Sequence, residues 1–248
     1  MQEITSVNNQ LVKDIVKLQQ KKYRDKENSF LLEGYKPIKE AFDAGIQLEQ
    51  VFVLKEKADK YSFLGNSLIL TNEIILKKIS TTDTPPEVVG VGVQKHSQLS
   101  DLKGKNKLVL LENIRDLGNL GTILRSAVAF GAEGIILYGT SADIYNPKCV
   151  RATVGNLWKL PVVYADNLEN LFDSYQRIAT LPHSNKCLKE FVPQEKILLM
   201  FGSEADGLSD KLIRYSNESV KIEMSRTVES LNLSVSCSVL MYELFVNK

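Results

Sequence analysis

The sequence predicts an α/β protein in two parts, each with strands and helices in alternation. In the second part, short and almost wholly apolar segments such as 107–113 and 195–202 are separated by segments with helical periodicity. This pattern is typical of a parallel sheet that is covered on both faces. The polar, lysine-rich stretch 95–106 interrupts the alternation. We therefore expect a smaller α/β domain over 1–94, a linker over 95–106 and a larger domain over 107–248.

The first domain is expected to alternate between helices and apolar strands. Leu11, Ile15 and Leu18 recur at helical spacing, with Ser6 or Asn8 as a possible N-cap. These positions predict one helix over 5–26. The remaining expected elements are strands over 29–34, 48–54, 66–71 and 87–94 and helices over 36–45 and 71–80.

The second domain repeats the alternation with longer apolar runs. Gly131 is expected to end its first helix. The expected strands are 107–113, 132–139, 162–165, 177–181, 195–202 and 219–225, and the expected helices are 120–131, 167–177 and 228–246, with a broken helix over 146–161.

Composition excludes several classes of protein. The chain has 248 residues, a net charge of +1 and 44% apolar residues, which is ordinary globular composition. No apolar run is long enough to span a membrane. The three cysteines are widely spaced and odd in number, which favours a reducing, cytoplasmic location over a disulfide framework. Two histidines cannot build a usual zinc site, so we expect no metal.

Charge is concentrated near the N-terminus in the segment 17–26. Its basic residues are Lys17, Lys21, Lys22, Arg24 and Lys26. Such a cluster can bind the phosphate backbone of a nucleic acid, and we predict that it does so here. The alternative is a solvated helix face without a ligand.

Short polar segments follow three apolar strands, at 113–121, 202–207 and 226–232. In open parallel sheets, ligands bind beyond the carboxyl ends of the strands. The usual nucleotide loops are absent, since neither G-x-G-x-x-G nor G-x-x-x-x-G-K-[ST] occurs, and there is no G-x-S-x-G elbow. These absences argue against a dinucleotide dehydrogenase, a P-loop enzyme and a serine hydrolase.

Three segments carry a resemblance to a known family. "NIRDLGNLGTILRSAVAFGAEGIIL", "ILLMFGSEADGLS" and "IEMSRTVESLNLSVSCSVLMYEL" resemble, in order and spacing, the three motifs of the SpoU/TrmH family of RNA 2′-O-ribose methyltransferases, in the SPOUT superfamily. "SFLLEGYKPIKEAF" is similar to the start of the L30e/L7Ae-like RNA-binding domain that many members carry. The resemblance implies a C-terminal trefoil knot and methyl transfer from S-adenosylmethionine to rRNA or tRNA.

The resemblance also assigns site residues. It implies catalytic roles for Asn119, Arg125, Glu204, Ser230 and Asn232. The residues implied to hold the cofactor are Thr180, Leu181, Gly202, Ile222, Met224 and Leu231. Because a guanidinium stays protonated in proteins, we favour Arg125 as a phosphate clamp and leave the general base open among Arg125, Glu204 and the substrate phosphate. Arg226 and Glu229 depart from the small residues frequent before the third motif and bear on substrate choice.

Other interpretations stay open for this site. Arg125 could form a surface ion pair with Glu133, and Glu204 could only cap a helix. The whole chain could be an RNA-binding protein of the same fold that has lost catalysis, or a related enzyme that modifies a base nitrogen. The intact polar residues argue against the former, and "SLNLSVS" favours the ribose branch.

The C-terminal helix predicts a homodimer. Leu231, Val235, Val239 and Tyr242 recur at helical spacing, and a second stripe, which contains Leu240, is displaced around the helix. One apolar stripe can cover the sheet, whereas the second needs another partner. The resemblance also implies pairing through this helix. The alternative is that the first domain covers the second stripe within one chain.

Overall fold

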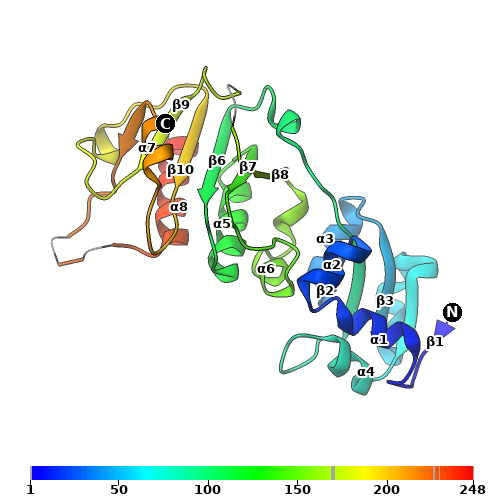
Figure 1. The fold of residues 1–248 in the computed structure, drawn as a ribbon. Coiled ribbons are helices and arrows are strands. Elements are labelled where there is room, and N and C mark those ends of the chain that lie inside the picture. Colours follow the sequence, from blue (N-terminus) through cyan, green and yellow to red (C-terminus); the bar gives the residue numbers. More distant parts are fainter. Residues whose placement is uncertain (1, 169–170, 226, 229, 248) are drawn as a thin grey trace. The chain divides into compact units, whose positions relative to one another are not determined.

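A computed structural model describes residues 2–168, 171–225, 227–228 and 230–247. Two compact units make up the chain, each with its own sheet (Figure 1). The first comprises Met1–Lys95 and Asp143–Trp158, and the second His96–Ala142 and Lys159–Lys248. The segment 143–158 therefore belongs to the first unit by its contacts, although the sequence around it belongs to the second. The domain boundaries expected from the sequence stay a prediction.

The first unit is built on a mixed five-stranded sheet. Its strands, in spatial order, are β1 (Gln2–Glu3), β4 (Leu68–Thr71), β3 (Leu48–Leu54), β5 (Val88–Val93) and β2 (Ser29–Glu33). β3 pairs parallel with β4 and antiparallel with β5, which in turn pairs antiparallel with β2. All five residues of β2 are buried, so this strand is covered on both faces.

Helices flank this sheet. They are α1 (Gln10–Lys17), α2 (Lys21–Glu27), α3 (Tyr35–Asp43), η1 (Lys55–Ser67), α4 (Glu73–Ile79), α6 (Pro147–Ala152) and η3 (Asn156–Trp158). One core cluster joins α1 and α4 to the sheet through side chains that include Val12, Ile15, Phe52, Ile75 and Ile79. The other faces of α1 and α4 are left to solvent.

The single helix expected over 5–26 is wrong, because the chain breaks between α1 and α2. The side chain of Asn9, rather than Ser6 or Asn8, caps α1 by accepting from the Leu11 backbone N–H. The break has a physical reason in Arg24, whose guanidinium is buried and donates to the carbonyls of Leu18 and Gln19 at 2.9 and 3.0 Å. A continuous helix would have used those carbonyls within its own ladder.

Two ion pairs hold the segment 143–158 in the first unit. Arg24 Nη2 lies 2.5 Å from Asp143 Oδ2, and Arg151 pairs with the buried carboxylate of Glu33. The ring of Phe30 contacts two aromatic rings of the segment, those of Tyr145 and Trp158. Because buried charges are costly without partners, each pair ties the segment firmly to this sheet.

The second unit has a six-stranded sheet. Its strands, in spatial order, are β11 (Glu218–Val220), β9 (Gln176–Thr180), β10 (Ile197–Phe201), β6 (Lys107–Glu112), β7 (Gly134–Tyr138) and β8 (Val162–Ala165). Each of the five pairings is parallel. The parallel α/β fold expected from the sequence is confirmed, and the carboxyl ends of all these strands lie at one edge.

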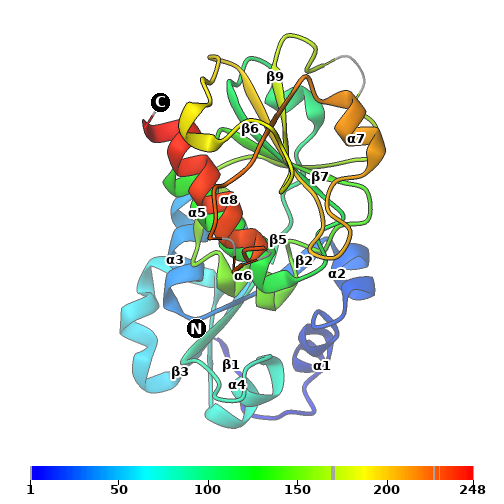
Figure 2. The same ribbon diagram turned by 90° about the vertical axis from the view of Figure 1, so that its left-hand side faces the viewer.

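Helices and turns cover both faces of this sheet. They are η2 (Leu99–Leu102), α5 (Leu117–Ala129), η4 (Leu188–Glu190), α7 (Asp210–Tyr215), α8 (Leu233–Tyr242) and η5 (Glu243–Asn247). α5 and α8 run side by side (Figure 2), joined by a 2.8 Å hydrogen bond from Ser238 to Ser126. A core cluster joins α7 and the turns at 171–174 to the sheet through side chains that include Leu110, Met200, Phe172 and Leu212.

Three expected elements of the second unit differ in the structure. No helix forms in the described part of 167–177, because 171–174 form turns and Gln176 already pairs with Ile197 in the sheet. The strand expected over 219–225 ends at Val220, and Lys221 forms only an isolated bridge with Cys187. The helix expected over 228–246 begins at Leu233, after its N-cap Asn232.

The segment 95–106 is not featureless, because it contains η2 and buries Leu102 in the core of the second unit. None of the helices in the described part of the chain is long and apolar enough to cross a membrane. The trefoil knot implied by the resemblance stays a prediction.

Candidate active site

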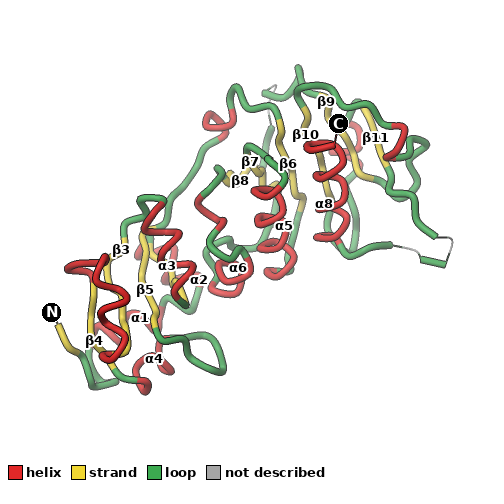
Figure 3. The backbone as a smooth tube through the Cα atoms, turned by 180° about the vertical axis from the view of Figure 1, so that it is seen from behind, coloured by secondary structure: helices red, strands yellow, loops and turns green. Residues whose placement is uncertain are grey.

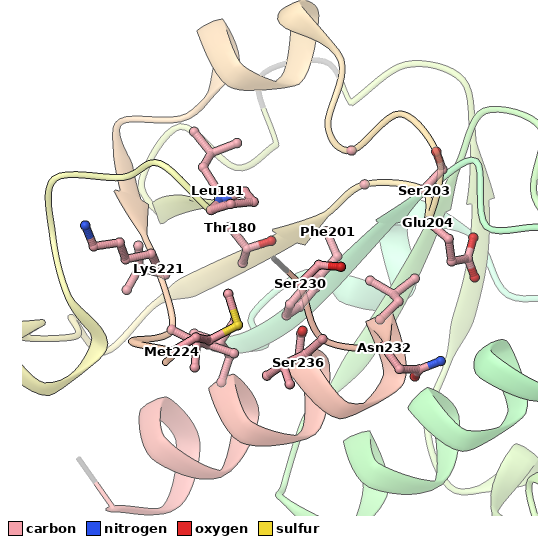
Figure 4. A pocket seen from close by; sticks show the side chains of 18 residues that line it. Thr180, Leu181, Phe201, Ser203, Glu204, Lys221, Met224, Ser230, Asn232 and Ser236 are labelled. Carbon is pink, nitrogen blue, oxygen red and sulfur yellow. The ribbon is translucent and has the colours of Figure 1, made fainter. Parts of the chain in front are cut away.

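A cavity lies where the chain leaves β9, β10 and β11 and enters α8 (Figure 4). Its volume is about 500 Å³, within the range of small-molecule sites. Its lining comes from the carboxyl ends of the three strands and from the first turns of α8. This is the edge at which a parallel sheet binds its ligands.

All six residues predicted to hold a cofactor line this cavity. They are Thr180, Leu181, Gly202, Ile222, Met224 and Leu231. Three of the residues predicted to be catalytic, Glu204, Ser230 and Asn232, line it as well. Sequence motifs that lie up to about fifty residues apart are thus brought to one place. That these residues bind S-adenosylmethionine or act on it stays a prediction.

A tight loop after β10 holds Glu204 at the cavity. Ser203 and Gly207 exchange both backbone hydrogen bonds, at 3.2 and 3.1 Å. The loop closes so tightly that a Cβ on Gly202 would lie 1.8 Å from the carbonyl carbon of Gly207. Only glycine fits at position 202 without moving the loop.

Asn232 fixes the entry to α8. Its side-chain oxygen accepts from the backbone N–H groups of Ser234 and Val235, at 2.9 and 3.4 Å, and from the Ser234 hydroxyl. This is the usual role of an N-cap asparagine. Because its oxygen is held by three donors, its amide nitrogen must point the other way.

A chain of hydrogen bonds joins residues of the three motifs. Asn232 donates from Nδ2 to Asn119 Oδ1 at 3.1 Å, and Asn119 donates from Nδ2 to Glu204 Oε1 at 2.9 Å. A carboxylate can only accept and a backbone N–H can only donate, so both amide orientations follow from the partners at the two ends. The backbone N–H of Asn119 in turn donates to Asp116, the N-cap of α5. The network therefore orients the carboxylate of Glu204.

Arg125 lies apart from this network. It is exposed on α5 and is not part of the cavity lining. The alternative ion pair with Glu133 is not formed, since that carboxylate accepts from the backbone N–H groups of Asn106 and Lys107. Among the described residues, no carboxylate lies within ion-pair distance of Arg125. Its role as a phosphate clamp stays a prediction.

The structure adds residues that sequence reasoning missed. Phe201, Lys221 and Ser236 also line the cavity. Outside it, the buried carboxylate of Glu112 at the end of β6 accepts from the Ser209 backbone N–H at 2.7 Å, which anchors the segment after Gly207. In the sequence, Glu112 stands out as an acidic residue that directly follows the apolar run 108–111.

The thiol of Cys237 is buried within α8. Burial raises the pKa of Cys237 well above its usual value. The thiol is therefore uncharged at neutral pH and behaves as a small apolar group in the packing of α8.

Arg226 and Glu229, which were expected to affect substrate choice, lie outside the described residues.

The predicted RNA-binding cluster of 17–26 is only partly on the surface. Arg24 is 1% exposed and paired with Asp143, so it cannot reach an RNA phosphate, and this part of the prediction is corrected. The four lysines are exposed. Lys17, Lys21 and Lys26 each pair with a neighbouring carboxylate, which offsets part of their charge.

Comparison with known proteins decides the family. The model of the SpoU rRNA Methylase family matches residues 106–242. The chain belongs to the SpoU rRNA methylase family. A second model, the MRM3-like substrate binding domain, matches residues 9–90 of this SpoU methylase.

Whole-length relatives of this SpoU methylase are found among curated and solved proteins. An uncharacterized tRNA/rRNA methyltransferase of Synechocystis is 32% identical over 97% of this chain and 92% of its own length. The Bacillus subtilis 23S rRNA guanosine 2′-O-methyltransferase RlmP is 28% identical over 98% and 99%. The structure of an AdoMet-bound rRNA methyltransferase from Sinorhizobium meliloti superposes with a TM-score of 0.88 at 32% identity, covering 98% of this chain and 97% of that one.

These findings confirm three predictions from the sequence: the family, the α/β fold class and the enzyme class. The chain is an S-adenosylmethionine-dependent RNA 2′-O-ribose methyltransferase. The alternative of an RNA-binding protein without catalysis is not supported by any of the relatives described above.

Proposed function

We propose that this methyltransferase acts on 23S ribosomal RNA and that the cavity beside Glu204 is its active site. The observation that carries the proposal is the hydrogen-bonded chain from Asn232 through Asn119 to Glu204 at the rim of that cavity. The substrate class is favoured by RlmP, whose name specifies 23S rRNA and whose whole length aligns with this chain. Transfer RNA is the alternative substrate.

The lining suits S-adenosylmethionine. Apolar surface for an adenosyl group is offered by Leu181, Ile222, Met224 and Leu231. Polar backbone groups are offered by the loop at Gly202, which lies close to the backbone of Gly207. When bound, the cofactor supplies an electrophilic methyl group on a sulfonium centre. The chain's own residues then have to orient a ribose 2′-hydroxyl in line with that methyl group. They also have to accept the proton that the hydroxyl loses.

Glu204 is the residue we favour for orienting or deprotonating the hydroxyl. One of its carboxylate oxygens is held by Asn119, which leaves the second oxygen to face the substrate. Asn119 and Asn232 act as positioning residues for this carboxylate. We propose that Arg125 contacts a phosphate next to the target ribose, where its charge would lower the pKa of the hydroxyl. The reaction as proposed requires no metal.

We also propose that the enzyme is a homodimer formed through α8. Leu231, Val235, Val239 and Tyr242 form an exposed stripe, from 37% to 47% exposed, whereas Leu240 is 2% exposed on the opposite side. One stripe covers the sheet and the other is left open, as the periodicity predicts. A two-fold dimer would cover the open stripe without leaving a further apolar edge.

We place the enzyme in the cytoplasm, because all three cysteines are free thiols and two of them are buried.

The substrate proposal is tested with ribosomal and transfer RNA from a strain that lacks the gene, incubated with labelled S-adenosylmethionine. Incorporation into 23S rRNA supports the proposal. Incorporation into transfer RNA alone would replace the substrate and leave the enzyme class unchanged.

A further inference from the structure

A hollow on the surface of the first unit lies between α1 and α4, which pack side by side (Figure 3). Its volume is about 560 Å³. The lining consists of Val7, Asn8, Lys13, Ile74, Lys77 and Lys78. Two helices thus contribute three lysines and an isoleucine to one small area.

The charge of this hollow is not compensated. Lys13, Lys77 and Lys78 are all exposed, and within the described ranges no carboxylate pairs with them or lines the hollow. Most lysines of 17–26 differ, since Lys17 and Lys21 each lie within 2.7 Å of a carboxylate on the same helix, and Lys26 pairs with Glu27. Free ammonium groups in a concave surface attract an anion more strongly than paired groups do.

A structural role accounts for only part of this charge, since Lys77 and Lys78 lie in the last turn of α4. Cations near the end of a helix can interact with its last carbonyls. At the end of α4, however, the side chain of Gln19 already donates to the carbonyls of Lys78, Ile79 and Ser80, at 3.4, 3.2 and 3.2 Å. Lys13 belongs to a different helix and faces the same hollow.

The apolar part of the hollow is also unexplained by folding. Ile74 is 69% exposed, whereas Ile75 and Ile79 of the same helix pack in the core of the unit. Val7 is 37% exposed. An exposed isoleucine surrounded by lysines suits a ligand with both anionic groups and flat apolar faces. A polynucleotide strand has phosphates, riboses and bases in this combination.

We propose that this hollow binds the backbone of the RNA substrate, an inference that rests on the proposed function. Lys13, Lys77 and Lys78 contact phosphates, and Ile74 packs against a ribose or base. The hollow lies within the range matched by the substrate-binding domain, residues 9–90, apart from Val7 and Asn8 at its edge. It would therefore hold RNA outside the nucleotide that is methylated.

The test compares two triple variants of the full chain. One is Lys13→Ala/Lys77→Ala/Lys78→Ala. The matched control removes the same charge from the same unit at lysines that pair with carboxylates, namely Lys39→Ala/Lys55→Ala/Lys60→Ala. Filter binding of in vitro-transcribed 23S rRNA is measured over a series of KCl concentrations, and circular dichroism melting checks that each variant is folded.

The slope of log affinity against log salt should fall by about 2 to 3 in the first variant, since each lost phosphate contact lowers it by roughly 0.7 to 0.9. The control should lower the slope by less than the roughly 0.7 to 0.9 expected for the loss of one phosphate contact. Ile74→Ala should weaken binding several-fold and leave the slope unchanged. Equal slopes in the two triple variants would overturn the inference, and this is also the result expected if the hollow binds an acidic protein.

Methylation by the wild type separates this result from the proposed function. If the wild type methylates 23S rRNA and the slopes are equal, only the hollow is rejected. If the wild type methylates transfer RNA instead, the proposed substrate is rejected and the slope comparison is repeated with that RNA. A reduced slope there would support the hollow as a binding surface for the true substrate.

Discussion

Asn232 donates to Asn119 across 3.1 Å, and this contact joins the N-cap of α8 to the first turn of α5. The same Asn119 donates to Glu204. Neither amide is needed for the sheet, and both are positioned by groups at helix N-termini. The contact explains how three separate motifs can orient one carboxylate.

The variant Asn232→Asp separates capping from positioning. An aspartate keeps the oxygen that caps α8 but loses the donor to Asn119. We expect an unchanged melting temperature and single-turnover methyl transfer slower by on the order of a hundredfold. Asn232→Ala should slow transfer to the same extent and also lose about 1 kcal/mol of stability with the cap. Normal turnover in Asn232→Asp would remove this contact from the mechanism.

Gly202→Ala should abolish cofactor binding. The added Cβ would lie 1.8 Å from the carbonyl carbon of Gly207, so the loop that lines the cavity must move. Gly131→Ala is the control, because its φ of +75° carries a conformational cost of about 1 kcal/mol while its Cβ meets open space. Titration calorimetry with S-adenosylhomocysteine should show binding only in the control. Wild-type affinity in Gly202→Ala would show that this loop does not form the cofactor site.

Arg125→Ala should slow methyl transfer by on the order of a hundredfold and leave cofactor affinity unchanged, because Arg125 does not line the cavity. Arg125→Lys keeps the positive charge and should recover part of the rate. Steady-state kinetics at saturating cofactor measures both variants. Unaltered kcat and KM in Arg125→Ala would support a surface residue without a role.

Asp143→Ala should destabilise the first unit. It leaves the Arg24 guanidinium buried without its carboxylate, at a cost of roughly 3 to 5 kcal/mol. Arg24→Met/Asp143→Ala removes the unpaired charge and should recover most of the loss. Urea unfolding followed by circular dichroism compares the two. If Asp143→Ala unfolds at the wild-type urea concentration, the segment 143–158 is not held by this pair.

Val235→Glu tests the proposed dimer. Val235 is 46% exposed on the open stripe of α8, so a glutamate there should not disturb the fold of one chain. In a dimer it would bury two like charges, and we expect dissociation. Sedimentation equilibrium at micromolar concentration should give twice 27.8 kDa for the wild type and the single-chain mass for the variant. A single-chain mass for the wild type would reject the dimer.

The sequence was sufficient for the parallel sheet, because continuous apolar strands are a local signal. The polar segments after the strands indicated only the edge at which a ligand binds, and the individual residues that line the cavity came from the resemblance to the family motifs. The break between α1 and α2 could not be predicted, since it depends on Arg24 reaching Asp143, 119 positions away. The turns at 171–174 were missed for a similar reason. Leu168, Phe172 and Tyr175 have the spacing of a helix, yet they pack in the core although 171–175 is not helical.

The position of 143–158 was equally beyond local reasoning. Its own sequence indicates a broken helix, which the structure contains as α6 and η3. That it packs on the sheet of the first unit follows only from long-range pairs such as Arg151 with Glu33. The exposed stripe of α8, by contrast, was visible as periodicity because burial on one side of a helix leaves a repeating pattern.

Alkaline digestion of the methylated RNA shows whether the methyl group is on a ribose 2′-hydroxyl or on a base. Alkali cleaves RNA through the 2′-hydroxyl, so a 2′-O-methyl group protects the adjacent phosphodiester. RNA from a strain lacking the gene is labelled with radioactive S-adenosylmethionine and the pure enzyme, then digested and separated by size. We expect the label to be recovered in dinucleotides and Gly202→Ala to give none. Label in mononucleotides would show methylation of a base and rule out methyl transfer to the ribose.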